Sequence, residues 1–297
     1  MPGLDPGIHV FSVSLKTWMA GTSPGHDDGE SENETMNFIE VNGVSLRYDV
    51  QGSGKPLVLI HEMGGTMESW DLVVPALSAR RRVIRYDTRG AGFSEKIRGV
   101  LKIATMTNDL IALLDALGIK EKVALAGTAV GGAIALHTAV RHPERVAAAI
   151  VSSPAVSIPE ANRAAVLERV ARFERDGLRV AVDATADNGY PAELRTDAAK
   201  FATFRARWLA NDPVSFAAIY RMLAAMDLTG ELAAIRCPVL VIGGQYDRGR
   251  PPSVVEPVAR AIPGAKFKVL STGHYAGLQT PELMAAEIAG FLDTAGA

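Results

Sequence analysis

From residue 38 onward, apolar and polar positions follow a regular plan of short runs separated by longer amphipathic stretches. The segments 38–41 and 45–50 alternate in polarity around Asn42-Gly43, the dipeptide that most favours a tight hairpin turn. We therefore predict an antiparallel hairpin at one edge of a sheet. Short apolar runs follow at 57–60, 82–86, 123–126, 146–151, 238–242 and 267–270. Runs of this kind are typical of buried parallel strands.

The stretches between these runs have helical spacing. Residues 107–117, for example, repeat apolar side chains three and four positions apart. The alternation of strand and helix predicts an α/β fold, with a mostly parallel sheet and helices on both faces. Between residues 159 and 234 the strands disappear, and we expect a helical lid inserted over the carboxyl ends of the strands, where ligands bind in open α/β sheets. The predicted core consists of residues 36–158 and 235–297.

The first 35 residues differ from the rest, because they are rich in Gly and Pro and strongly acidic. They lack the basic and apolar regions of a secretory signal. Two interpretations remain open for this stretch. It is a disordered tail with no folded role, or the chain was assigned too early a start and begins naturally at Met36, directly before the first alternating segment.

Composition restricts the partners. The chain has 297 residues with 31 basic and 33 acidic side chains, so no overall field favours nucleic acid or an anionic membrane surface. Its single cysteine, Cys237, cannot form an internal disulfide, and we expect a cytoplasmic location. No apolar run approaches the roughly 20 residues that span a bilayer. We expect a small-molecule substrate, and no metal or organic cofactor, since no ligand-spaced cluster of His and carboxylates occurs. A homo-oligomer remains open.

Candidate chemistry lies in the turns that follow the strands. After the run 123–126 comes Gly127-Thr128-Ala129-Val130-Gly131-Gly132, and then a helix. Glycines on both sides of a central residue permit the sharp strand-to-helix turn of a nucleophile elbow. The usual central residue is serine, whereas the methyl group of Ala129 cannot attack a substrate. A dinucleotide-binding phosphate loop competes with this interpretation, but the third glycine and a downstream acidic ribose ligand are not convincingly present.

Three further turns complete the set. His61-Glu62-Met63-Gly64-Gly65 follows the run 57–60, where a tight turn presents the backbone amide of Met63. Together with the amide of Val130, it can form a two-donor oxyanion hole. Asp247 follows the run 238–242, and His274 follows 267–270. A histidine oriented by an aspartate is a competent general base near neutral pH.

In their order along the chain, these motifs resemble those of the α/β-hydrolase superfamily over residues 36–292. The segment Tyr86-Asp87-Thr88-Arg89-Gly90-Ala91-Gly92-Phe93-Ser94 adds a fifth motif. Within the superfamily, Arg236-Cys237-Pro238-Val239 and Thr272-Gly273-His274 resemble the enol-lactonase-like group, for example the 3-oxoadipate enol-lactonases. The aminoacrylate hydrolases are also similar, because some have Gly-x-Ala-x-Gly at the elbow. The resemblance implies a hydrolase and carries over to Asp247, His274 and the two backbone donors.

Ala129 leaves three explanations open. The natural enzyme uses His274 to activate water or move a proton, the residue is an engineered replacement of serine, or the pocket is not catalytic. We favour the first, because a dead pocket does not need an ordered acid and base. The expected reaction is hydrolysis of a small activated substrate, such as an enol lactone, enamine or ester-like compound, without an acyl-enzyme. Alternatives are a ligand-binding protein and a cofactor-free lyase or oxygenase.

Other side chains have weaker claims to a role. Glu62 stands where the family usually has glycine, and its carboxylate either faces solvent or a loop amide, or contacts the substrate. Trp208 and Tyr275 are further candidate substrate contacts, and Met222 and Met226 either line the pocket or pack within the lid. Arg248 and Arg250 could attract a carboxylate, although solvated loop charges are favoured. We expect structural or surface roles for Thr128, His137 and His142, and for Asp87 and Arg89 in a turn where the family commonly has a buried ion pair.

Overall fold

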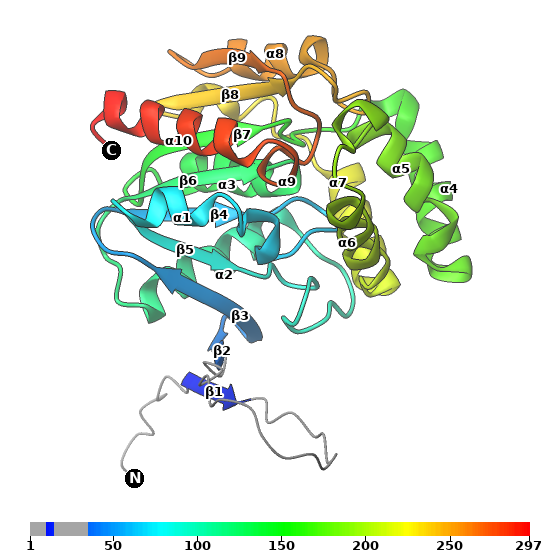
Figure 1. Ribbon diagram of the computed structural model, residues 1–297, viewed down its shortest axis with the longest axis horizontal. Helices are drawn as coiled ribbons and strands as arrows, with labels where there is room; N and C mark the ends of the chain where they lie inside the picture. Colours follow the sequence, from blue (N-terminus) through cyan, green and yellow to red (C-terminus); the bar gives the residue numbers. More distant parts are fainter. Residues whose placement is uncertain (1–9, 15–34) are drawn as a thin grey trace, which may run out of the picture.

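A computed structural model describes residues 10–14 and 35–297 of the chain. These residues form a nine-stranded sheet in the order β1-β2-β3-β5-β4-β6-β7-β8-β9 (Figure 1). The pairs from β1 through β3 to β5 are antiparallel, and the pairs from β5 through β4 to β9 are parallel. The predicted mostly parallel α/β sheet is therefore confirmed. The strands are β1 (Val10–Ser14), β2 (Thr35–Val41), β3 (Val44–Gln51), β4 (Pro56–Ile60), β5 (Arg82–Tyr86), β6 (Val123–Thr128), β7 (Val146–Ser152), β8 (Val239–Gly244) and β9 (Lys266–Leu270).

The predicted hairpin is formed by β2 and β3. Its two turn residues, Asn42 and Gly43, have φ values of 48° and 69°. Positive φ at both positions is the requirement of a type I′ turn, whose twist matches that of the flanking strands. Val41 pairs with Val44 across the turn.

The structure corrects one expectation for the N-terminal stretch. Val10–Ser14, within the segment predicted to be disordered, forms β1 and pairs antiparallel with β2. The physical reason is that the outer edge of β2 presents unpaired backbone N–H and C=O groups, which a short Val- and Ser-containing segment can satisfy. The rest of the expectation falls on residues 1–9 and 15–34, which lie outside the described residues.

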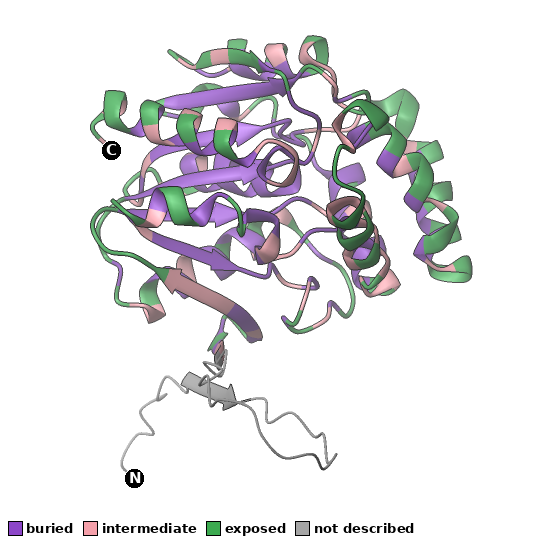
Figure 2. Cartoon of the chain, in the orientation of Figure 1, coloured by how far each residue is buried: buried purple, intermediate pink, exposed green. Residues whose placement is uncertain are grey.

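Helices cover both faces of the sheet, because successive residues of each buried strand point to opposite sides. Val58 and Ile60 of β4 belong to the hydrophobic cluster that also contains residues of helices α2 (Ile103–Ala116), α3 (Val130–Arg141) and α8 (Pro252–Arg260). Leu57 and Leu59 belong to the cluster on the other face, which contains residues of α1 (Val74–Ser78), α9 (Ala276–Gln279) and α10 (Pro281–Ala295). Figure 2 shows the buried strands between helices whose outer surfaces are exposed. Across the described ranges, no helix is both long and apolar enough to cross a membrane.

Between β7 and β8 the chain forms a run of helices without a strand, which we call the helical segment (160–234). It comprises α4 (Glu160–Asp176), η2 (Leu178–Val180), α5 (Val182–Gly189), η3 (Ala192–Leu194), α6 (Ala198–Leu209), α7 (Pro213–Ala225) and η4 (Leu232–Ala234). Asp197 and Asp212 cap α6 and α7 by accepting hydrogen bonds from backbone amides. Helices α4 to α7 lie beyond one end of the sheet (Figure 1).

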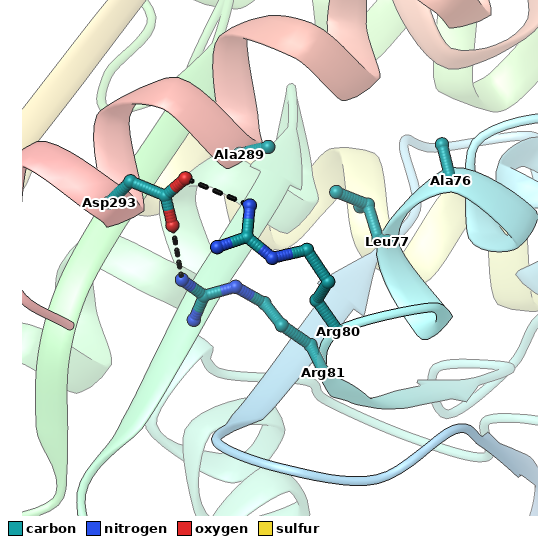
Figure 3. A pocket seen from close by; sticks show the side chains of 6 residues that line it. All are labelled: Ala76, Leu77, Arg80, Arg81, Ala289 and Asp293. Atoms are coloured by element: carbon teal, nitrogen blue, oxygen red, sulfur yellow. Dashed lines mark hydrogen bonds and ion pairs between the residues drawn. The ribbon is translucent and has the colours of Figure 1, made fainter.

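At the amino end of β5, a small pocket of about 50 Å³ lies between α1 and α10 (Figure 3). Arg80 and Arg81 both pair there with Asp293, at 3.2 Å and 3.7 Å. The two cations thus share one carboxylate and join α10 to the turn after α1. All of the predicted site residues lie elsewhere, at or beyond the carboxyl ends of the strands.

Candidate active site

Ala129 lies at a sharp turn between β6 and α3, with φ 51° and ψ −110°. Glycines on either side make this turn sterically possible. A Cβ atom on Gly127 would lie 2.4 Å from the carbonyl carbon of Gly131, and one on Gly131 would lie 2.3 Å from the carbonyl oxygen of Ile60. The turn therefore has the strained strand-to-helix geometry that the sequence predicted.

Asp247 and His274, which lie 27 positions apart in the chain, meet at the carboxyl ends of β8 and β9. His274 Nδ1 lies 2.7 Å from Asp247 Oδ2. Burial raises the pKa of Asp247, but the charge of His274 and hydrogen bonds to the carboxylate outweigh this effect, so the pKa of Asp247 lies below its ordinary value. Because an ionised carboxylate only accepts hydrogen bonds, Nδ1 carries the ring proton. Nε2 is then left to accept a proton from another group.

Two further residues hold Asp247, and sequence reasoning missed them in this role. Ser153 Oγ donates to Asp247 Oδ2 at 2.8 Å, and the backbone amide of Arg250 donates to Oδ1 at 2.8 Å. Ser153 is fully buried, follows β7 directly and has a φ of 45°. A position just beyond a strand of the parallel sheet is the signal that could have drawn attention to it.

Met63 and Val130 lie in the turns that follow two adjacent strands, β4 and β6. Val130 is the first residue of α3, so its N–H has no acceptor within the helix. Met63 lies in the tight turn closed by the Gly65 amide, which donates to the Glu62 carbonyl at 3.1 Å. Neither the Met63 nor the Val130 amide has an acceptor in the described part of the chain.

Glu62 departs from its expected placement. Its carboxylate was expected to face solvent or a loop amide if it had no role in the site, but the residue is only 3% exposed. Its Oε1 accepts a hydrogen bond from Ser69 Oγ at 2.8 Å. The physical reason is that Gly64 and Gly65 fold the turn back on itself, so that Glu62 points into the protein towards η1 (Met67–Trp70), on which Ser69 lies.

Trp208 and Tyr275 join the helical segment to the site. Trp208 is buried, and a Cβ atom on Gly64 would lie only 2.6 Å from its Cδ1. Asn211 Nδ2 also donates to the Gly64 carbonyl at 3.0 Å. The ring of Tyr275 meets that of His274 edge to face, with centroids 5.2 Å apart. Burial raises the pKa of Tyr275 well above its ordinary value, so its phenol stays neutral.

The remaining candidate residues make their side-chain contacts with residues other than Asp247 and His274. Asp87 and Arg89 are both in ion pairs, but with different partners, since Asp87 contacts Arg47 at 3.4 Å and Arg89 contacts Asp109 at 2.7 Å.

His137 is buried with Nδ1 2.7 Å from Thr107 Oγ1, and burial lowers its pKa. Met222 and Met226 pack in the main core and, together with His137, line a cavity of about 670 Å³. Thr128 is buried, and His142 lies beside Glu144.

Arg248 and Arg250 differ in exposure and in hydrogen-bond partners, although only one residue separates them in the chain. Arg248 is more than half exposed and pairs with Glu193 at 3.0 Å. Arg250 is half-buried, and its Nη1 donates to the Pro154 carbonyl at 3.1 Å.

As for metals, nowhere in residues 10–14 and 35–297 do three His, Cys, Asp or Glu side chains converge in a way that could hold an ion.

The mixed sheet, the turn at Ala129 and the Asp247–His274 pair at the carboxyl ends of β8 and β9 define an α/β-hydrolase. The chain belongs to the hydrolase family described as serine aminopeptidase, S33, which matches residues 53–274.

Individual proteins show similarity over most of their length. A protein of Azorhizobium caulinodans named carbamate hydrolase RutD is 28% identical over 260 residues, covering 86% of this chain and 98% of its own. The 3-oxoadipate enol-lactonase 1 of Acinetobacter baylyi is 27% identical, covering 88% and 98%. Among solved structures, the enol-lactonase from Burkholderia xenovorans LB400 superimposes with a TM-score of 0.81 at 28% identity, covering 86% of this chain and 99% of its own.

Proposed function

We propose that this protein hydrolyses a small activated substrate by direct attack of water, with His274 as the general base and without an acyl-enzyme. One observation carries the proposal. The apex of the turn is occupied by Ala129, which has no nucleophilic atom, while Asp247 and His274 remain joined at 2.7 Å. A base with its orienting acid, but without a covalent nucleophile, is suited to moving a proton from water.

In the proposed reaction each residue has a separate task. Asp247 fixes the ring of His274 through Nδ1 and stabilises the positive charge that forms on it. Nε2 takes a proton from water while the water oxygen bonds to the electrophilic carbon. The amides of Met63 and Val130 act as the oxyanion hole for the negative charge that develops. The bond to the leaving group then breaks, and the proton passes from His274 to that group.

The absence of a covalent step limits the substrate. Removing the nucleophile from a catalytic triad leaves only oxyanion binding and positioning, so the remaining barrier must be low. Enol lactones, enamines and ester-like compounds are electrophilic enough for this route. Relatives named as an enol-lactonase and a carbamate hydrolase support a carbonyl substrate with a heteroatom leaving group. We further propose that the helical segment acts as a lid, and that Glu62, Trp208 and Tyr275 contact the substrate.

The test uses the wild-type protein, His274→Ala and Ala129→Ser, assayed against a panel of enol lactones, enamines and activated esters with product mass as the readout. General-base catalysis contributes about 10²–10⁴-fold, so His274→Ala should lose at least 100-fold in kcat. Ala129→Ser should keep the activity or add esterase activity.

Each competing outcome is distinct in this assay. A His274→Ala variant with full activity would refute the assigned role. A product whose mass does not include added water would indicate a lyase or oxygenase. A ligand that binds tightly and is recovered unchanged, whatever residue stands at position 274, would indicate a binding protein.

A further inference from the structure

The cavity of about 670 Å³ lies between the chain that leads into α2, helix α3, and the second half of α7 with the turn after it. Pockets that hold small organic ligands have volumes of about 300–1,000 Å³, so this cavity has the size of a ligand site. Neither Asp247 nor His274, nor the apex at Ala129, belongs to its lining. The lining residue His137 lies about two turns of α3, or about 10 Å, beyond Val130. The cavity is therefore separate from the candidate active site.

Apolar side chains form most of the wall of this cavity. Leu101 and Leu228 are buried, and Val100 at the mouth is 92% exposed. Met222 and Met226 add two flexible side chains, which can adapt to the shape of a ligand. Burial of an apolar molecule against such a wall removes apolar surface from water on both sides. The wall therefore favours an apolar ligand.

The charged side chains of the wall balance one another. Lys102 and Arg221 are basic, whereas Asp227 and Glu231 are acidic. Arg221 is already paired with a glutamate of α4, and the carboxylate of Asp227 accepts hydrogen bonds from the turn that follows it. The wall offers no excess of either charge, so an uncharged ligand suits it better than an ion.

His137 supplies a directional polar contact. It is 6% exposed, and its Nδ1 lies 2.7 Å from Thr107 Oγ1. The Thr107 hydroxyl has no other acceptor in the described residues, so it donates to Nδ1, and the proton of the neutral ring is on Nε2. Burial lowers the pKa of His137, which keeps the ring neutral near pH 7.

The Nε2–H group of His137 opens onto the cavity. It has no acceptor within residues 36–297, yet Nε2 is not one of the polar atoms that the described residues seal off without a partner. Since His137 lines the cavity, the accessible side of Nε2 faces it. A largely buried donor without an acceptor is unfavourable, and a ligand oxygen that accepts from it removes this cost.

We propose that this cavity is a second binding site, which takes an uncharged, apolar small molecule with a carbonyl oxygen that accepts a hydrogen bond from His137 Nε2. The inference does not depend on the proposed function, because the two sites share no residue.

NMR of the full-length protein labelled at the methionine methyl groups locates the binding. Met222 and Met226 report on the cavity, and Met63 reports on the candidate active site. Acetophenone and ethylbenzene are suitable probes, because their shapes are similar, only the ketone has an acceptor oxygen, and neither has a leaving group to hydrolyse. Both probes should shift the Met222 and Met226 signals, and titration gives a Kd for each. Shifts confined to Met63, or no shifts at all, overturn the proposal.

The ratio of the two Kd values isolates the hydrogen bond, since the cost of removing each probe from water is the same for every variant. His137→Phe keeps an aromatic ring without the donor, and it should weaken acetophenone relative to ethylbenzene by about fivefold, the factor that one net hydrogen bond gives. His142→Phe, the matched control on a histidine outside the lining, should leave the ratio unchanged. An equal ratio in the wild-type protein and His137→Phe overturns the role of His137.

A second variant closes the cavity without altering the core. Ala225 is exposed and lines the cavity, so Ala225→Trp should abolish the shifts from both probes even if His137→Phe does not fold. Ala164→Trp, on an exposed position of α4 outside the lining, should keep them. Unchanged binding by Ala225→Trp overturns the site, provided that near-UV circular dichroism shows each variant folded.

Two other occupants give different results. Benzoate, an anion of similar size, should bind more weakly than acetophenone, and tighter binding of benzoate overturns the assignment of an uncharged ligand. Met222 and Met226 signals that change with protein concentration but with neither probe would identify a second copy of this chain as the occupant, and would overturn a small-molecule site.

Discussion

Replacing Ser153 with alanine should destabilise the protein through Asp247. Ser153 is one of three hydrogen-bond donors to this buried carboxylate, together with His274 and the Arg250 amide. A hydrogen bond to a charged group contributes about 1.5–3 kcal/mol, more than a neutral one, and the variant leaves one acceptor position of Asp247 unpaired. The φ of 45° at Ser153 adds little to the difference, because serine and alanine both carry a Cβ atom. We expect a loss of about 2 kcal/mol in the free energy of unfolding at pH 7.

The stability cost of Ser153→Ala should vary with pH, in a direction set by the pKa of Asp247. The folded pKa of Asp247 lies below its ordinary value, so its charge stabilises the fold above the unfolded pKa, about 3.9, and this contribution is lost as the pH falls through the folded pKa. Ser153 helps to stabilise the ionised form. The cost of Ser153→Ala should therefore be largest near neutral pH and should shrink at acidic pH, where Asp247 takes up a proton.

Ser152 provides a matched control one position away. Both serines are fully buried, but Ser152 Oγ has no hydrogen-bond partner in the described residues. Removing an unsatisfied buried hydroxyl relieves its desolvation penalty, so Ser152→Ala should be neutral or stabilising by up to about 1 kcal/mol. Urea unfolding of the wild-type protein and both variants, at pH 7 and at the lowest pH that still gives a cooperative transition, measures the difference. Equal effects of the two substitutions, or an unchanged stability of Ser153→Ala at pH 7, would refute the reasoning.

Two further predictions concern the surroundings of the site. Gly64→Ala places a Cβ atom 2.6 Å from Trp208 Cδ1 at a φ of +83°; it should displace the helical segment, lower the stability by at least about 1 kcal/mol and speed limited proteolysis within residues 160–234. Asp87→Asn leaves Arg47 paired with Glu68 at 2.6 Å but offers only one side-chain oxygen to the backbone amides of Met67 and Phe93, which donate to the two carboxylate oxygens of Asp87; leaving one of these buried amides without an acceptor costs about 1–3 kcal/mol, which urea unfolding would show.

The order of strands and helices was predictable because its causes are local. Alternation around Asn42-Gly43, short apolar runs and helical spacing each act within a few residues, and the turns after these runs carried Asp247 and His274. β1 was not predictable in this way, because Val10–Ser14 is a strand only through its pairing with the edge of β2. In addition, the Gly-rich and acidic composition of the first 35 residues is typical of a disordered tail.

Side-chain partners were harder to predict than elements. Ser153 donates to Asp247 across 94 positions of sequence, and although its position just beyond β7 points to the site, it does not identify this partner. Glu62 turns inward because Ser69, on the following 3-10 helix, offers a hydroxyl. Arg248 and Arg250 stand in the same short loop, yet Arg248 pairs with Glu193 of the helical segment, whereas Arg250 Nη1 donates to the Pro154 carbonyl.

The conformation of Ala129 explains how the turn can persist with alanine at its apex. A non-glycine residue at a φ of 51° and ψ of −110° carries strain of about 1–3 kcal/mol, which survives only when the surroundings enforce it. Here the close approaches of Gly127 to Gly131, and of Gly131 to the Ile60 carbonyl, enforce it from outside the apex. The apex side chain makes no part of these contacts. A serine and an alanine would therefore experience the same turn, and the Val130 amide would point in the same direction in both, so that loss of the hydroxyl removes a nucleophile without disturbing the donor beside it.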